Sequence, residues 1–128
     1  MQAEPRWPDP AELLVHALEE ALPVSAGIDT PPDLEGRLFL RVHVLGGRDT
    51  GATETTRVDV EAYAPVGEAH KLADDARRYL LFELAGTSPG GLGLVDTVRT
   101  EVRPRRMFYL NPHVERVVGT YSLDARLQ

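Results

Sequence analysis

The stretch from Thr56 to Gly86 constrains the fold most, because an alternating pattern is followed directly by a helical one. Apolar and polar side chains alternate from residue 57 to residue 64, and in a β-strand successive side chains point to opposite faces. We therefore predict a strand with one buried and one polar face, ended by Pro65, which lacks an amide donor. The expected buried face holds Val58, Val60, Ala62 and Ala64, and the polar face holds Arg57, Asp59, Glu61 and Tyr63.

The residues after Pro65 predict an amphipathic helix. Apolar side chains recur there at the three- and four-residue spacing that forms a single stripe along a helix. Gly86 is placed to end the helix in a left-handed conformation. The predicted stripe is Ala69, Leu72, Ala73, Ala76, Leu80 and Leu84.

The remaining elements complete a two-layer domain. A helix is predicted to begin near Asp9, a potential cap, with Pro10 in its first turn and Pro23 closing it. Alternating runs predict strands over 38–45, 94–103 and 114–127, with Gly119 a candidate bulge. Residues 24–28 are a short strand or an extended link. Residues 1–128 thus predict one α+β domain: a mostly antiparallel sheet of four or five strands, in the order α-β-β-α-β-β, with two helices on one face.

Two connecting segments stand out. We predict a polar loop of about ten residues from Gly46 to Thr55, and loops of that length often contact a partner; a floppy tip is the alternative. The segment from Pro104 to Pro112 is too apolar for a plain solvent loop. We expect it to pack along its own sheet edge or against another chain.

The composition excludes several classes of protein. The 128 residues include no cysteine, so disulfides and thiolate metal sites are excluded. The first residues do not read as a signal peptide, and no apolar run is long enough to span a bilayer. Synthesis in the cytoplasm is therefore expected.

The charge is unevenly distributed along the chain. Residues 1–35 hold eight acids against one base, a net charge of −7, within a chain whose total is −6. Residues 99–116 carry five arginines against two glutamates. These stretches could complement each other between neighbouring subunits, or they are two unrelated solvated surfaces.

No arrangement of residues predicts an enzyme. His43 with Asp59 and Glu61 on the paired strand could bind a metal or perform acid–base work, but cross-strand charge pairing explains the same residues. The histidines lack metal-motif spacing, and the Gly-rich turn at 90–93 precedes a strand and lacks the lysine of a phosphate loop. The mixture of arginine and aromatic residues over 103–109 fits a single-stranded nucleic-acid platform, although a subunit contact is the better use in an acidic protein.

The order of motifs resembles the tail terminator proteins of long-tailed phages. The likeness rests on RVDVEAYAP followed by an Ala/Leu/Arg helix, and on the final segment VDTVRTEVRPRRMFYLNPHVERVVGTYSLDARLQ. It includes the opening helix, the long hairpin before the second helix, and a last strand introduced by Asn111-Pro112-His113-Val114. It extends over about residues 9–127.

This resemblance implies a structural virion protein at the junction of tail and neck. Such subunits form a ring, usually of six, that caps the tail tube and docks the head connector, while DNA passes through the lumen without specific binding. No cofactor, metal or membrane is expected. The alternatives are another head–tail connector or neck protein, or a small α+β ligand-binding domain. The expected contact residues are Arg103, Arg105, Arg106, Phe108, Tyr109, Arg48, Asp49, Arg41, Asp59 and Glu61.

Overall fold

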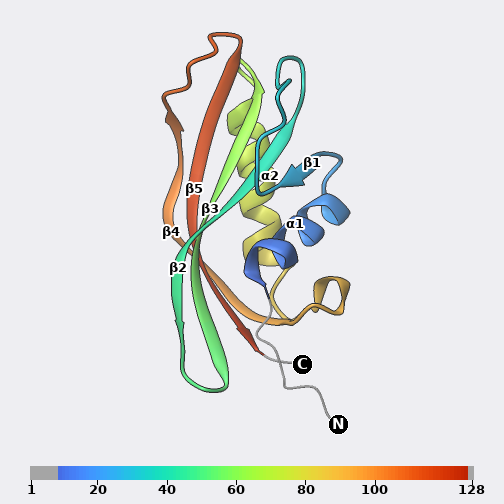
Figure 1. Cartoon of the computed structure of the whole chain (residues 1–128), viewed down its shortest axis with the longest axis vertical. Helices are drawn as coiled ribbons and strands as arrows, with labels where there is room; N and C mark the ends of the chain where they lie inside the picture. The colour runs from blue at the N-terminus through green and yellow to red at the C-terminus, as the bar shows by residue number, and fades with distance from the viewer. Residues whose placement is uncertain (1–8, 127–128) are drawn as a thin grey trace.

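A computed structural model describes residues 9–126 as two helices packed on one face of a five-stranded sheet (Figure 1). The helices are α1 (Pro10–Ala21) and α2 (Ala69–Phe82), with a short 3-10 turn, η1, at Pro89–Gly91. None of the helices in this part of the chain is long and apolar enough to cross a membrane. The strands are β1 (Ser25–Gly27), β2 (Phe39–Asp49), β3 (Thr53–Pro65), β4 (Leu94–Met107) and β5 (Val114–Arg126).

The sheet is mixed, with the order β1-β2-β3-β5-β4. The predicted α+β class and the placement of both helices on one face are confirmed, but the mostly antiparallel sheet and the α-β-β-α-β-β order need correction. β1 is a strand in its own right and pairs parallel to β2, whereas the other neighbours are antiparallel. The three residues of β1 are too few to produce a readable alternation, which is why the sequence left this segment open.

The first helix begins and ends as its sequence predicts. The Asp9 carboxylate accepts hydrogen bonds from the amides of Ala11 and Glu12, at 3.0 and 3.3 Å, and Pro10 occupies the first turn. Leu22 caps the other end in an extended conformation, immediately before Pro23. The buried stripe of α1 is Leu13, Leu14, Ala17 and Leu18.

The second helix is shorter than predicted. It ends at Phe82, where the amide of Glu83 still reaches the Tyr79 carbonyl, so Gly86 is not its cap. Gly86 does have a left-handed φ of +83°, but its amide donates to the carbonyl of Val95 at 2.8 Å and so fixes the turn into β4. Leu84 is fully buried beyond the helix end, which explains why it fits the helical stripe.

The long loop predicted from Gly46 to Thr55 is instead a paired hairpin. Gly46 to Asp49 continue β2 opposite Glu54 to Arg57, and only residues 50–52 form the turn. Leu45 is the extra residue of a bulge, since the register steps from Val44 directly to Gly46. Glycine is required at position 47, because an added Cβ would collide with the Thr55 carbonyl oxygen.

The last two strands correct two further predictions. β4 runs through Pro104 to Met107, so the segment predicted as a connection from 104 to 112 is half strand and half loop. Gly119 is not a bulge: it pairs regularly with Val60 of β3. The irregularities lie in β4, whose register shifts between Val95 and Thr97, Thr100 and Val102, and Val102 and Arg105.

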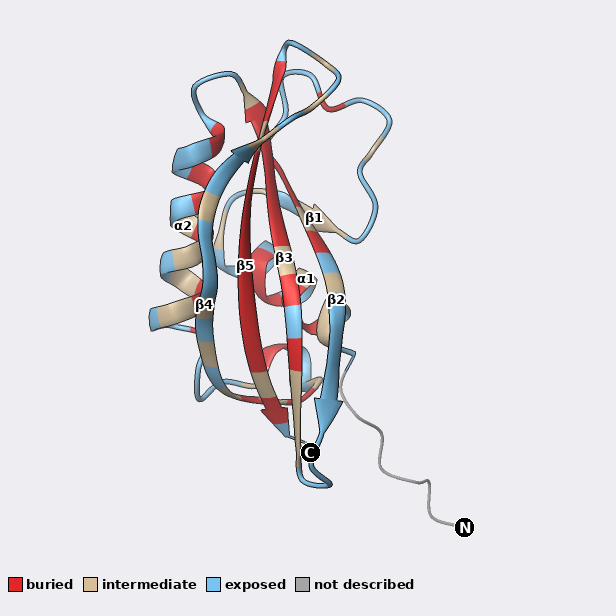
Figure 2. Cartoon of the chain, turned by 90° about the vertical axis from the view of Figure 1, so that its left-hand side faces the viewer, coloured by how far each residue is buried: buried red, intermediate tan, exposed pale blue. Residues whose placement is uncertain are grey.

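One apolar core joins the helices to the sheet, as predicted. Side chains of α1, α2 and every long strand contribute to it, and β5 is buried over most of its length (Figure 2). A second, smaller cluster lies on the other face of the sheet, where Leu34, Phe39, Tyr63 and Val114 pack with Tyr109. The predicted members of the main core are all present: Leu40, Val42, Val58, Val60, Leu72, Ala76 and Leu80.

Candidate functional site

The polar side chains of β2, β3 and β5 gather on the sheet face that carries no helix. The register places Arg41 opposite Glu61, and His43 opposite Asp59. Because opposed residues of antiparallel strands share a face, these side chains point away from α1 and α2. The predicted polar face therefore exists, and we call it the helix-free face.

Glu61 is the centre of a buried charge cluster on the helix-free face. Arg41 Nη1 donates to Glu61 Oε2 at 2.5 Å, while the Tyr63 hydroxyl and Arg116 Nε donate to Oε1 at 2.7 and 2.9 Å. The Glu61 side chain is only 1% exposed. Glu61 was predicted as a contact residue for a subunit or partner; its burial corrects that prediction, since groups of the same chain already bind both of its oxygens.

The pKa values in this cluster follow from its contacts. Burial by itself would raise the pKa of Glu61, but hydrogen bonds from Tyr63 and Arg116, and the charges of Arg116 and Arg41, hold that pKa below its usual range. Burial, together with the hydrogen bond to Glu61, raises the pKa of the Tyr63 hydroxyl. The cluster therefore contains a carboxylate, two guanidinium groups and a neutral phenol at neutral pH.

The cluster also ties distant elements together. Arg41 Nε donates to the Ile28 carbonyl at 2.9 Å, which fixes the residue following β1 to β2. Arg116 brings in β5, so the cluster joins four segments of the chain across the sheet. Sequence reasoning placed Arg41 and Glu61 together but missed Arg116; its position in an alternating strand was the available signal.

Elsewhere on the helix-free face, polar side chains of neighbouring strands form hydrogen bonds with one another. Thr120 donates to Asp59 at 2.5 Å, and Ser122 donates to Glu101. His43 stands apart, 48% exposed and 4.0 Å from Glu61. In residues 9–126 no group of three His, Asp or Glu side chains could hold a metal ion.

The hydrogen bonds nearest the β2–β3 turn centre on Asp124. Its carboxylate accepts from Thr55 at 2.7 Å, Thr97 at 2.6 Å and Arg99 at 2.8 Å. These contacts, with that of Arg99 the largest, outweigh burial and lower the pKa of Asp124 to about 2 from its ordinary 3.8. Arg48 and Asp49 lie close to this end of the sheet, exposed on the last residues of β2.

Acidification should expose the contribution of Asp124 to stability. Because its folded pKa is depressed, its contribution is present above its ordinary pKa and is lost as the pH falls through the folded value of about 2. Replacing Asp124 with Asn should therefore reduce the free energy of unfolding near neutral pH, and this deficit should shrink as the pH falls towards 2. Urea melts across the acid range check this, with Asp74→Asn on the exposed side of α2 as the control; a deficit independent of pH would contradict it.

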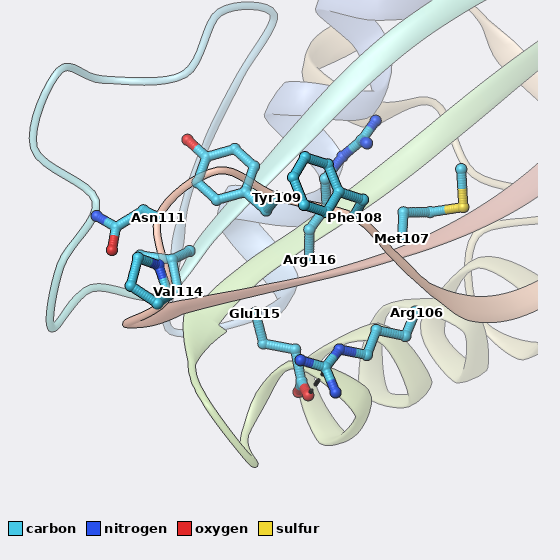
Figure 3. Close-up of a pocket in the computed structure, with 9 residues that line it drawn as sticks. Arg106, Met107, Phe108, Tyr109, Asn111, Val114, Glu115 and Arg116 are labelled. Carbon is cyan, nitrogen blue, oxygen red and sulfur yellow. Dashed lines mark ion pairs between the residues drawn. The ribbon is translucent and has the colours of Figure 1, made fainter.

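A pocket of about 450 Å³ lies where β4 ends and β5 begins (Figure 3). Arg106 reaches across it to Glu115, with 3.8 Å between Nε and Oε2. Tyr109 turns inward and meets the Tyr63 ring edge to face, at 5.3 Å between ring centres. The two predicted aromatic contact residues of this region therefore differ in their surroundings: Tyr109 is anchored in the fold, whereas Phe108 is 81% exposed.

The three arginines expected at a subunit contact all lie on β4, the edge strand opposite β1. Arg105 Nη1 donates to the Val118 carbonyl at 3.0 Å, and Arg106 is 68% exposed beside Glu115. The side chain of Arg103 is exposed. The structure therefore supplies an exposed, arginine-rich sheet edge and a protruding loop.

The chain matches no protein-family model. It also matches no curated protein sequence.

Proposed function

We propose that this chain is the subunit of a ring, with six copies expected, that caps the tail tube of a long-tailed phage and joins it to the head connector. The proposal combines the likeness of the sequence to tail terminators with the distribution of charge over the fold. In this role the protein is a structural part of the virion. Its partners are copies of itself, the tail tube protein and a head-completion protein.

The observation that carries the proposal is that opposite edges of the sheet bear unlike charge. Arg103, Arg105 and Arg106 lie on β4 at one edge, and α1 packs on β1 and β2 at the other. Residues 9–35 contain seven acidic side chains and no lysine or arginine. A ring that closes by head-to-tail contacts needs two different complementary patches on each subunit, and these edges provide them.

The two ends of the long axis are available for other partners. The β2–β3 hairpin, with Arg48 and Asp49, projects at one end, and the β4–β5 loop lies at the other (Figure 1). We assign the hairpin to the contact with the tube or connector. In the assembled ring the internally paired side chains of the helix-free face leave few free cations to hold DNA phosphates, which suits passage without specific binding.

Reversing the β4 charges tests the ring. Arg103→Glu, Arg105→Glu and Arg106→Glu together should place acid against acid at every contact. Single exposed ion pairs contribute only about 0–1 kcal/mol each, but a six-fold ring repeats the repulsion at all interfaces. We expect a folded monomer by circular dichroism and native mass spectrometry, and tails of variable length under the electron microscope.

Two companion variants make this test specific. Arg57→Glu with Arg78→Glu reverses charge away from β4 and should still form rings. Arg48→Ser with Asp49→Ser should form rings that no longer act on tails. If the triple variant gives tails of normal length, the ring model is refuted. If deleting the protein instead gives tails of normal length that lack heads, the protein belongs to the head side of the neck.

A further inference from the structure

We propose that the ring contact is a knob that enters a pocket: Phe108 and Leu110 of one copy insert into a cleft between the α1–β1 link and the start of α2 of the next copy. This inference rests on the proposed ring and names the surfaces that close it. The occupant of the cleft is a second copy of this chain.

The knob is an apolar tip on a firmly held loop. Phe108 and Leu110 are 81% and 87% exposed, the two highest values among the large apolar side chains of residues 9–126. The residues between and after them are anchored: Tyr109 packs on Tyr63, and Asn111 Nδ2 donates to Glu35 at 2.9 Å. Two large apolar side chains presented on an ordered loop form the kind of anchor that dominates binding energy at interfaces.

The pocket is a mainly apolar cleft of about 360 Å³. Its wall comes from the chain after α1 and from the first turns of α2, with Leu38 contributing from the residue before β2. Leu38 is 40% exposed, and the nearby Val66 is 56% exposed, so the apolar surface extends beyond the cleft. The apolar lining is Leu22, Pro23, Val24, Leu38 and Leu72, and the charged rim is Glu68, Lys71 and Asp75.

The fold keeps a knob away from its own pocket. Tyr109 holds the knob loop against Tyr63, which faces the helix-free side of the sheet. The pocket lies on the side covered by α1 and α2. A single copy therefore leaves both apolar surfaces exposed, whereas a neighbouring copy can cover them, and the contact is between unlike surfaces, as a ring requires.

Unlike charges beside the knob and beside the pocket favour pairing of these two surfaces. Arg105 and Arg106 precede the knob on β4, and Arg106 is 68% exposed. Beside the pocket, Lys71 is already paired with Asp75 at 3.0 Å, which leaves Glu68 on the rim and Glu19 on the adjoining surface as acids for the incoming arginines. An apolar centre with a charged rim is the usual anatomy of a protein interface.

Site-directed crosslinking tests the contact directly, because the native chain has no cysteine. Phe108→Cys and Leu38→Cys are prepared as separate full-length proteins, mixed, and treated with a short bismaleimide. We expect dimers that contain one copy of each variant. The matched control replaces Phe108→Cys with Phe82→Cys on α2, a phenylalanine of similar exposure at 77%. The knob mixture should give about tenfold more crosslinked dimer than the control, since a specific contact raises the local thiol concentration.

A second measurement uses loss of the knob. Phe108→Ser with Leu110→Ser should weaken self-association by roughly a hundredfold in sedimentation experiments, because two apolar anchors are lost. Both side chains are exposed, so the variant should melt like the wild type. Phe82→Ser should leave association unchanged.

The outcomes separate this inference from the proposed function. Crosslinking of Phe108→Cys with itself would show a symmetric contact, and a yield equal to the Phe82→Cys control would show no specific contact; either result overturns the inference. If wild-type protein still sets tail length in those cases, the ring cap stands with a different interface. If wild-type protein has no effect on tails but the knob and pocket crosslink, the contact stands and the phage role falls.

Discussion

Replacing Glu61 with alanine is expected to lower the free energy of unfolding by about 3–5 kcal/mol, the range for breaking a buried ion pair by removing one partner. The loss would be large because Arg41 and Arg116 would remain close to each other without the carboxylate that both now contact. The Tyr63 hydroxyl would also lose its acceptor. Urea denaturation near neutral pH measures the change.

The neighbouring histidine provides the control for this prediction. His43 lies 4.0 Å from the same carboxylate but is 48% exposed, so His43→Ala should change stability by less than about 0.5 kcal/mol. Glu61→Gln tests the pH dependence of this contribution. Because the folded pKa of Glu61 is depressed, the ionised carboxylate stabilises the fold above its ordinary pKa, and this stabilisation is lost as the pH falls through the folded pKa. The deficit of the Gln variant should therefore narrow in acid. If Glu61→Ala melts like the wild type, the cluster does not hold the sheet together.

Truncating Leu80 to alanine is the second large effect, with an expected loss of about 2–5 kcal/mol. Leu80 is 1% exposed and lies on α2, which packs against β3, β4 and β5. Removing its side chain leaves a cavity where the helix layer meets the sheet. The loss should appear as a lower urea midpoint with an unchanged denaturant slope, since the same surface is exposed on unfolding.

Phe82 is the comparison on the same helix. Its side chain is larger than that of Leu80 but is 77% exposed, so Phe82→Ala should shift the midpoint little. If the two variants were equally stable, burial at the helix–sheet boundary would not be the source of the stability of α2.

The parts of the fold that could be predicted are those whose signal is local. Asp9 and Pro10 mark the start of α1 because a helix start needs an acceptor for its free amides. The alternation from Val58 to Ala64 identified the core face of β3 because the strand has a period of two. The α2 stripe was equally readable, apart from Leu84, which is buried by the turn and not by the helix.

The parts that could not be predicted depend on which strands become neighbours. Glycines at 46, 47 and 51 are typical of a loop, and nothing local shows that Gly47 sits opposite Thr56 in a ladder. The parallel position of β1 is also a tertiary property, fixed in part by Arg41 reaching the Ile28 carbonyl. Pro104 suggested the end of a strand, whereas an edge strand tolerates proline where the ladder is shifted.

The same limits apply to the candidate site. The Arg-rich segment and the apolar Phe108 were predicted as contact residues, and both are exposed on the β4 side of the sheet. The burial of Glu61 was not predicted, because alternation assigns a face but not what lies over it. Tyr109 was grouped with Phe108 because the two residues are adjacent in the sequence. Only the structure shows that Tyr109 packs on Tyr63.

The irregular course of β4 has a consequence for how copies avoid aggregation. A straight outer strand offers a row of free backbone groups to which another strand can add without limit, as in amyloid. β4 interrupts that row at three register shifts, the last of which contains Pro104, whose nitrogen has no hydrogen to donate. Backbone-to-backbone growth along this edge is therefore disfavoured, and association is left to side chains, whose fixed geometry can limit the number of copies.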